Sequence, residues 1–109
     1  MIPADVRIFL CTEPVDMRKS FDGLTGAARE HLQRDPDQGG LFVFVNRRSN
    51  RLKMVWLDGL GYCLLYKRLH RALFRLPELG GRARIDGAQL AKLLAGVPTR
   101  RAREQHRAF

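Results

Sequence analysis

Arginine and lysine side chains are concentrated in the middle of the chain, where a single acid, Asp58, interrupts them. Guanidinium and ammonium groups bind phosphate oxygens through charge-assisted hydrogen bonds, so a cluster of them is typical of proteins that bind polyanions. Eight basic residues lie in this stretch, namely Arg47, Arg48, Arg51, Lys53, Lys67, Arg68, Arg71 and Arg75. We expect the first seven of them to contact the phosphates of a nucleic acid.

The net charge of +9 arises entirely from the second part of the chain. Residues 1–46 hold five basic and seven acidic side chains, whereas residues 47–109 hold fifteen and four. In a small basic domain without a membrane signal, such an imbalance favours nucleic acid as the partner. An acidic protein surface is the alternative partner, and a solvated basic face without a dedicated partner is the third possibility.

The carboxylates, histidines and cysteines do not form the patterns that enzymatic chemistry requires. A metal-dependent nuclease needs converging carboxylates, and the basic part of the chain offers only four acids, of which Asp58 is explained by an Asp-Gly turn. The three histidines are dispersed, and Cys11 and Cys63 lie inside apolar runs, as buried free cysteines do. We therefore expect no catalytic residue, metal site, disulfide or cofactor.

The first part of the chain predicts a strand followed by a helix. Residues 6–12 form a β-branched and aromatic run that ends at a Glu-Pro pair, which is typical of a strand closed by a turn. Asp16 then stands at an N-cap position, and apolar residues recur every three or four positions, so we expect a helix over about residues 16–34. On that helix Asp22 follows Arg18 by one turn and would pair with it.

Apolar runs separated by turns predict an antiparallel meander in the middle of the chain. Residues 41–45 and 52–57 are joined by the polar loop NRRSN, which has the length of a hairpin connection. An Asp-Gly turn then leads into a third strand over residues 62–69, and residues 71–76 form a further strand or the end of the third.

Side chains alternate along a strand, so the second strand of the hairpin should separate apolar from basic residues. The residues expected to face the core are Leu52, Met54 and Trp56. Arg51 and Lys53 would then face solvent beside Val55, as a charged ridge that Arg47 and Arg48 extend from the hairpin loop.

The end of the chain predicts a second, shorter helix and a basic tail. Asp86 can cap a helix over about residues 86–95, and Gly96 and Pro98 would end it. The sequence thus predicts a single α+β domain over residues 1–97, in which a meander of about four or five strands packs against the long helix, and a flexible tail over residues 98–109. The start of the chain has no secretory signal pattern, so we expect a cytoplasmic protein.

Three segments in a fixed order carry a resemblance to a known family. They read VDMRKSFDGL from residue 15, LFVFVNRRSNRLKMVWLDGLGYCLLYKRLHRALFRLP from residue 41 and QLAKLLAG from residue 89. Together they closely resemble the TnpB-type accessory protein of the insertion-sequence sixty-six family. The positions that match the first motif are Asp16, Arg18, Lys19, Phe21, Asp22 and Gly23.

The resemblance implies a bacterial mobile-element protein that is encoded beside a larger transposase. Such a protein is needed for efficient transposition but does not itself carry out strand transfer, and it differs from the much larger RNA-guided nucleases that share the TnpB label. With the basic surface, this predicts a non-catalytic accessory protein that binds DNA and works with the transposase. The alternative is an adaptor that binds the transposase without contacting DNA directly.

Overall fold

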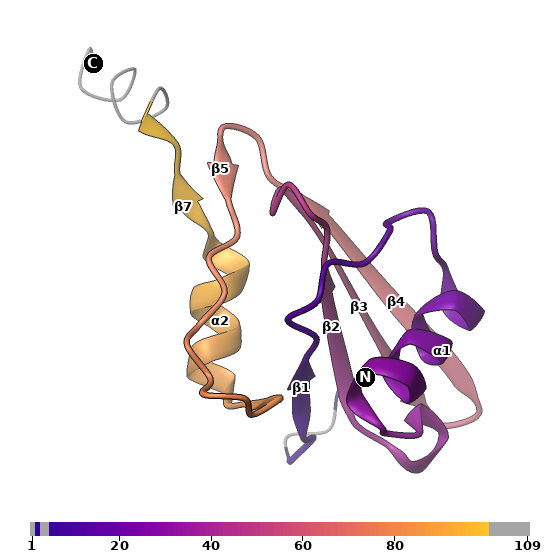
Figure 1. The fold of residues 1–109 in the computed structure, drawn as a ribbon. Coiled ribbons are helices and arrows are strands. Elements are labelled where there is room, and N and C mark those ends of the chain that lie inside the picture. Colours follow the sequence, from indigo (N-terminus) through magenta and orange to yellow (C-terminus); the bar gives the residue numbers. More distant parts are fainter. Residues whose placement is uncertain (1, 3–4, 101–109) are drawn as a thin grey trace.

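The computed structural model describes residue 2 and residues 5–100 (Figure 1). This part of the chain has two α-helices, a short 3-10 helix, a five-stranded sheet and a small two-stranded sheet, so the predicted α+β class is confirmed. In chain order the elements are β1 (Ile8–Leu10), α1 (Phe21–Leu32), η1 (Pro36–Gln38), β2 (Leu41–Val45), β3 (Arg51–Asp58), β4 (Gly61–Arg68), β5 (Ala72–Leu73), β6 (Arg84–Ile85), α2 (Gly87–Ala95) and β7 (Val97–Pro98).

The five-stranded sheet has the strand order β4-β3-β2-β1-β6. The neighbours β2 and β3, and likewise β3 and β4, pair antiparallel, which confirms the predicted meander. β1 instead lies parallel to β2, because the chain passes from one to the other through α1 and η1. β6 closes the other side of the sheet by pairing antiparallel with β1.

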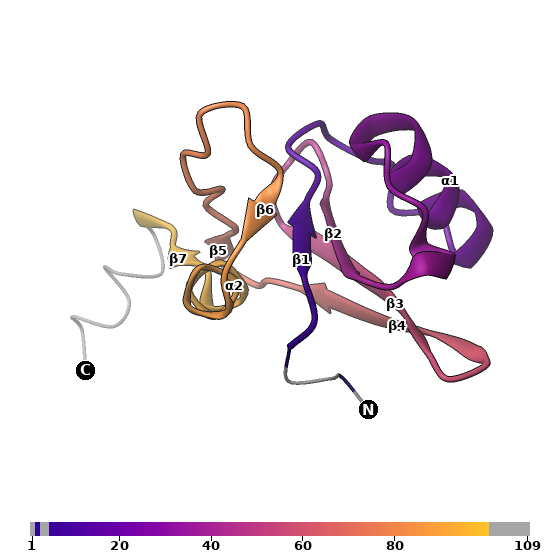
Figure 2. The ribbon, with the colours of Figure 1, turned by 90° about the horizontal axis from the view of Figure 1, so that it is seen from below.

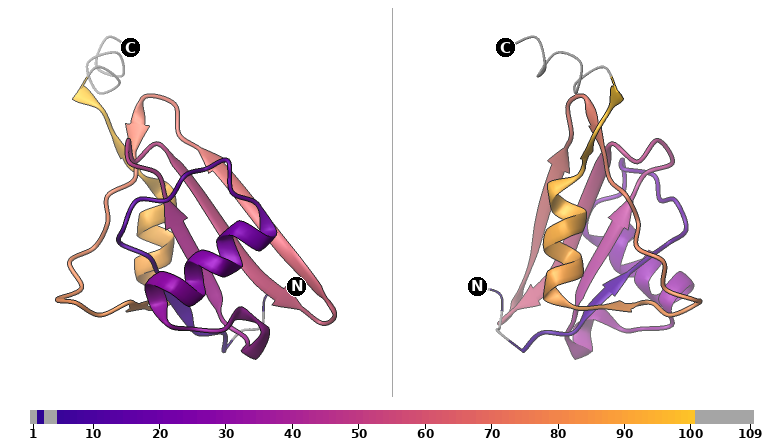
Figure 3. Two further views of the ribbon diagram at one scale, coloured as in Figure 1. Left: turned by 45° about the vertical axis from the view of Figure 1, so that its right-hand side comes forward. Right: turned by 90° about the vertical axis from the view of Figure 1, so that its left-hand side faces the viewer.

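The helices cover opposite faces of the sheet (Figure 2 and Figure 3). The cluster on the α1 side contains Phe9, Leu24, Phe42, Phe44 and Val55. The cluster on the α2 side contains Leu10, Val43, Met54, Trp56 and Leu93. Successive residues of β2 enter alternate clusters, which explains why its whole LFVFV run is buried.

The helix α1 is shorter than predicted at its N-terminal end. Ser20, in an extended conformation, precedes its first turn, and the carbonyl of Asp16 accepts a hydrogen bond from the N–H of Lys19 at 3.1 Å. Residues 16–19 thus form a turn before the helix, and the prediction that Asp16 is the N-cap is wrong. Because Arg18 lies in this turn, it pairs with Asp16 and not with Asp22.

The second helix follows the prediction closely. The Asp86 carboxylate accepts the N–H of Gln89, whose side chain accepts the N–H of Asp86, so a capping box fixes the start of α2. After α2 the chain forms β7, which pairs with β5. Pro98 therefore lies in a strand, and the predicted tail falls mostly on residues 101–109, outside the described residues.

Gly96, which ends α2, occupies a position that an alanine would strain. Its φ of +72° lies in the left-handed region, and an added Cβ would come within 2.7 Å of Cδ1 of Leu69. We expect Gly96→Ala to lower the free energy of unfolding by about 1–3 kcal/mol, measured by urea denaturation. Gly87→Ala, in the open first turn of the same helix, is the control, and an equal loss in both variants would contradict the prediction.

Candidate nucleic-acid interface

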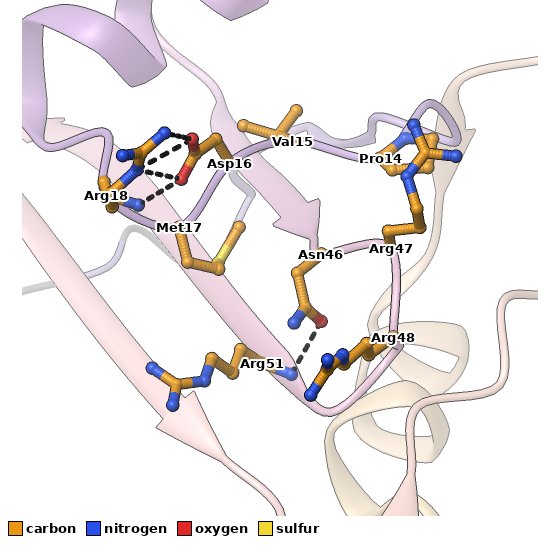
Figure 4. A pocket seen from close by; sticks show the side chains of 9 residues that line it. All are labelled: Pro14, Val15, Asp16, Met17, Arg18, Asn46, Arg47, Arg48 and Arg51. Atoms are coloured by element: carbon orange, nitrogen blue, oxygen red, sulfur yellow. Dashed lines mark hydrogen bonds and ion pairs between the residues drawn. The ribbon is translucent and has the colours of Figure 1, made fainter.

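An open hollow of about 610 Å³ lies between the segment before α1 and the loop that joins β2 to β3 (Figure 4). We call it the arginine groove; its lining residues are Pro14, Val15, Asp16, Met17, Arg18, Asn46, Arg47, Arg48 and Arg51. Four of these side chains are guanidinium cations and one is a carboxylate. The groove is therefore strongly positive, although its two walls come from separate parts of the sequence.

Asn46 gives the hairpin wall of the groove its shape. Its side-chain oxygen accepts the N–H of Asn50 at 3.0 Å and that of Arg51 at 2.9 Å, and its amide donates to the side chain of Asn50 at 2.7 Å. Together with the backbone bond from the N–H of Asn46 to the carbonyl of Arg51 at 3.1 Å, these bonds close the end of the hairpin and hold a compact loop. Arg47 and Arg48 follow Asn46 directly, so the loop presents both side chains to solvent.

An ion pair between Asp16 and Arg18 forms part of the opposite wall. The Arg18 Nη2 donates to Oδ2 of Asp16 at 2.7 Å and its Nε to the same oxygen at 3.0 Å, while the backbone N–H of Arg18 donates to Oδ1 at 2.9 Å. These hydrogen bonds from Arg18 lower the pKa of the Asp16 carboxyl to about 2. Asp16 is therefore charged at neutral pH and offsets one of the four arginines.

The segment that carries Asp16 and Arg18 is fixed to the end of β2. The N–H of Val15 donates to the carbonyl of Val45 at 3.0 Å, and the side chains of Val15 and Met17 are buried. This contact brings the first motif beside the hairpin loop. The sequence did not indicate Arg18 as a member of the basic surface, because nothing in the chain from Pro14 to Arg18 has the pattern of a strand that would lie beside the hairpin.

Lys53 does not face solvent, so the predicted charged ridge on β3 is wrong. Its side chain is only 7% exposed, because α1 and the turn before it cover this face of the sheet. The Nζ donates to the carbonyl of Lys19 at 2.7 Å and lies 4.7 Å from the centre of the Tyr66 ring. Val55, expected on the same exposed face, is fully buried. Lys53 is thus a buried residue that links β3 to the turn before α1.

The basic residues of β4 and the segment after it do not line the groove. Lys67 points to the α2 face, where its Nζ donates to the carbonyl of Leu94 at 2.6 Å. Arg68 is exposed on β4 directly opposite Arg51, and Arg71 is exposed beyond that strand. Of the seven predicted cations, the structure brings together Arg47, Arg48 and Arg51. A DNA-binding role stays a prediction for all seven, and the burial of Lys53 argues against it at that position.

The motif residues that follow Arg18 connect the groove to α1. The carbonyl of Lys19 accepts the hydrogen bond from the Lys53 ammonium. Gly23 allows the Lys19 side chain to pack against the first turn of α1, since a Cβ at position 23 would come within 3.0 Å of that side chain. Phe21 and Asp22 are exposed in the first turn of α1. Within the motif, the groove therefore takes only Asp16 and Arg18 as charged lining residues.

Groups for metal binding or thiol chemistry are not assembled in residue 2 and residues 5–100. No cluster of three or more His, Cys, Asp or Glu side chains occurs there. Cys11 and Cys63 are free thiols, and burial raises the pKa of the Cys11 thiol, which disfavours the reactive thiolate. The same part of the chain contains no helix with the length and apolar character needed to cross a membrane.

Comparison with known proteins identifies the family. The family described as IS66 Orf2 like protein matches residues 6–104. Two proteins of Sinorhizobium fredii (strain NBRC 101917 / NGR234) are similar: "Uncharacterized protein y4hO", 41% identical over 98% of this chain and 96% of its own length, and "Uncharacterized protein y4jC", 32% identical over 92% and 86%. No solved structure matches. The chain therefore belongs to the IS66 Orf2-like family of insertion-sequence accessory proteins.

Proposed function

We propose that this protein assists transposition as a non-catalytic factor that binds the DNA backbone through the arginine groove. The observation that supports the proposal is the meeting of Arg18, Arg47, Arg48 and Arg51 around one hollow that contains a single carboxylate. Guanidinium groups bind phosphate oxygens with directed, bidentate hydrogen bonds. A groove that is open to solvent and bordered by a protruding loop suits an extended polyanion.

The groove suits contact with phosphates more than reading of bases. Arg47 and Arg48 project from a short loop, whereas the surfaces that read bases most fully are helices or two-stranded ribbons that enter the major groove of DNA. We therefore expect affinity for DNA with little sequence preference, and recognition of the element's ends would depend on DNA shape or on the transposase.

Titration of the purified protein with labelled duplex and single-stranded DNA tests the proposal. If Arg47, Arg48 and Arg51 each neutralise one phosphate of a duplex, the logarithm of the binding constant should fall by about 2.7 for each tenfold rise in salt. A pull-down with the transposase encoded by the same element runs in parallel. Retention of the transposase without any DNA binding at low salt would contradict the proposal and support the adaptor alternative.

Asp16→Asn should strengthen DNA binding. Asparagine keeps the oxygen that accepts the Arg18 N–H but removes the charge that pairs with the guanidinium, so Arg18 becomes available for a further phosphate. We expect the affinity for duplex DNA at about 0.1 M salt to rise by up to about tenfold. The control is Asp22→Asn, which makes the same change of charge at an exposed site outside the groove. An equal gain in both variants would show that only net charge matters.

A further inference from the structure

The outer strand of the sheet, β4, has an open edge. β4 pairs with β3 without interruption along its eight residues, and in the described part of the chain no strand pairs with its other side. Figure 3 shows it as the outermost strand, at the edge of the sheet opposite β6. The opposite edge of the sheet, by contrast, is the two-residue strand β6. A long regular edge is a template for pairing with a further strand.

The hydrogen-bond pattern identifies the backbone groups that this edge presents. The N–H of Leu69 donates to the carbonyl of Asn50 at 2.8 Å, so residues at alternate positions before Leu69 also bond to β3. The residues between them direct their N–H and C=O groups outward; they are Tyr62, Leu64, Tyr66 and Arg68. β4 contains no proline and no bulge, and its Lys67 side chain is directed toward Leu94, so Arg68 at its last end is the one charged side chain that it exposes.

The middle of β4 is apolar and exposed. Leu65 and Tyr66 have 38% and 46% of their surface exposed, and Leu64 beside them is half-buried. The Tyr66 hydroxyl accepts a hydrogen bond from Nη1 of Arg51, and the Lys53 ammonium lies over its ring. These contacts hold the Tyr66 side chain on the α1 face of the sheet, where its remaining surface borders the open edge.

The two ends of β4 carry opposite charges. At its first end the hydroxyl of Tyr62 is bonded to the carboxylate of Asp37, which belongs to η1 and remains more than half exposed. Asp37 and Asp35 share the single cation Arg29, so this end keeps a net negative charge. At its last end Arg68 is exposed opposite Arg51, a like-charge neighbour that Arg68 cannot pair with. A strand with this distribution is complementary to an antiparallel copy of itself, whereas a parallel copy would place equal charges together.

We propose that two copies of this chain form a dimer by antiparallel pairing of their β4 strands about Leu65. In this register Leu64 lies opposite Tyr66 of the second copy, and Tyr62 lies opposite Arg68 of the second copy. All outward-facing backbone groups then obtain partners. The Arg68 guanidinium of each copy reaches the Tyr62 ring and Asp37 of the other, and one continuous sheet extends through both copies.

Sedimentation of the full chain at about 100 µM tests the dimer, since mass action favours association at that concentration. We expect the wild-type protein to sediment as a dimer. Leu65→Lys would place two ammonium groups together at the symmetry axis and should give a monomer. A monomeric wild-type protein, or a dimer that persists in Leu65→Lys, would overturn the proposal, and a strand of the transposase would become the candidate occupant of the edge.

A charge exchange between Arg68 and Asp37 tests the register independently of folding. Arg68→Glu and Asp37→Arg should each raise the dimer dissociation constant by about tenfold or more, because like charges then face each other twice. An equimolar mixture of the two variants should form mixed dimers, since every facing pair is again of opposite sign. Arg75→Glu, an equal change at an exposed site off β4, should leave the dimer intact. Failure of the mixture to associate would contradict the proposed register.

Discussion

Replacement of Arg47, Arg48 and Arg51 together by glutamine is expected to weaken binding to duplex DNA by several hundredfold at about 0.1 M salt. Each phosphate contact contributes about 0.9 to the slope of log affinity against log salt, and this electrostatic contribution vanishes near 1 M salt. At 0.1 M salt, one tenfold step lower, the loss of three contacts therefore lowers the logarithm of the binding constant by about 2.7. The slope itself should fall by the same amount. Both quantities follow from fluorescence anisotropy titrations at several salt concentrations.

The matched control removes the same charge elsewhere. Arg75, Arg82 and Arg84 are exposed and do not line the arginine groove, so their joint replacement by glutamine changes the net charge equally. We expect a much smaller loss of affinity in this control. Equal losses in the two triple variants would show that DNA responds to the overall charge of the protein and not to the groove. Urea denaturation of both variants checks that each remains folded.

The hairpin is the part of the fold that the sequence predicts best. The spacing of apolar runs identified β2, β3 and the turn before β4, and the alternation in β3 correctly assigned Leu52, Met54 and Trp56 to one side of the sheet. Alternation identifies the residues that share a face, but it does not reveal whether another element covers that face. The prediction for Lys53 and Val55 was wrong for this reason, because α1 covers them.

The sequence did contain one indication that both faces are covered. All five residues of β2 are apolar, and a strand with a solvent-exposed face would normally alternate. A strand that is buried on both sides requires helices on both sides, and β3 beside it shares that environment. Lys53 at 7% exposure then needs a polar partner, which only the three-dimensional position of the Lys19 carbonyl identifies.

The arginine groove could be predicted only in part. Arg47, Arg48 and Arg51 follow from the hairpin and its basic loop, whereas Arg18 joins them through the contact between Val15 and Val45. That contact links residues that are 30 positions apart by a single hydrogen bond, which leaves no periodic signal in the sequence. Asp16 likewise has the residue type of a helix cap but sits in the preceding turn, where it pairs with Arg18.

The turn over residues 16–19 is held by the buried side chain of Lys53, so Lys53→Ala should strongly destabilise the protein. The change removes a buried four-carbon stem and the hydrogen bond that its ammonium donates to the carbonyl of Lys19. We expect the free energy of unfolding to fall by about 2–4 kcal/mol, measured by urea denaturation with an unchanged slope. Lys53→Met, which keeps the stem and removes only the charge and its bond, should cost less, about 1–2 kcal/mol.

Lys92→Ala provides the control for the loss of a lysine without loss of an interior contact. Lys92 is exposed on α2, and its replacement should change the free energy of unfolding by less than about 0.5 kcal/mol. If Lys53→Ala and Lys92→Ala were equally stable, the bond to Lys19 would not contribute. Because that bond fixes the end of the segment that carries Arg18, Lys53→Met should also weaken DNA binding even though Lys53 cannot reach the DNA. A loss of affinity with an unchanged salt slope would distinguish a residue that positions the groove from one that contacts phosphate, because a lost phosphate contact lowers the slope by about 0.9.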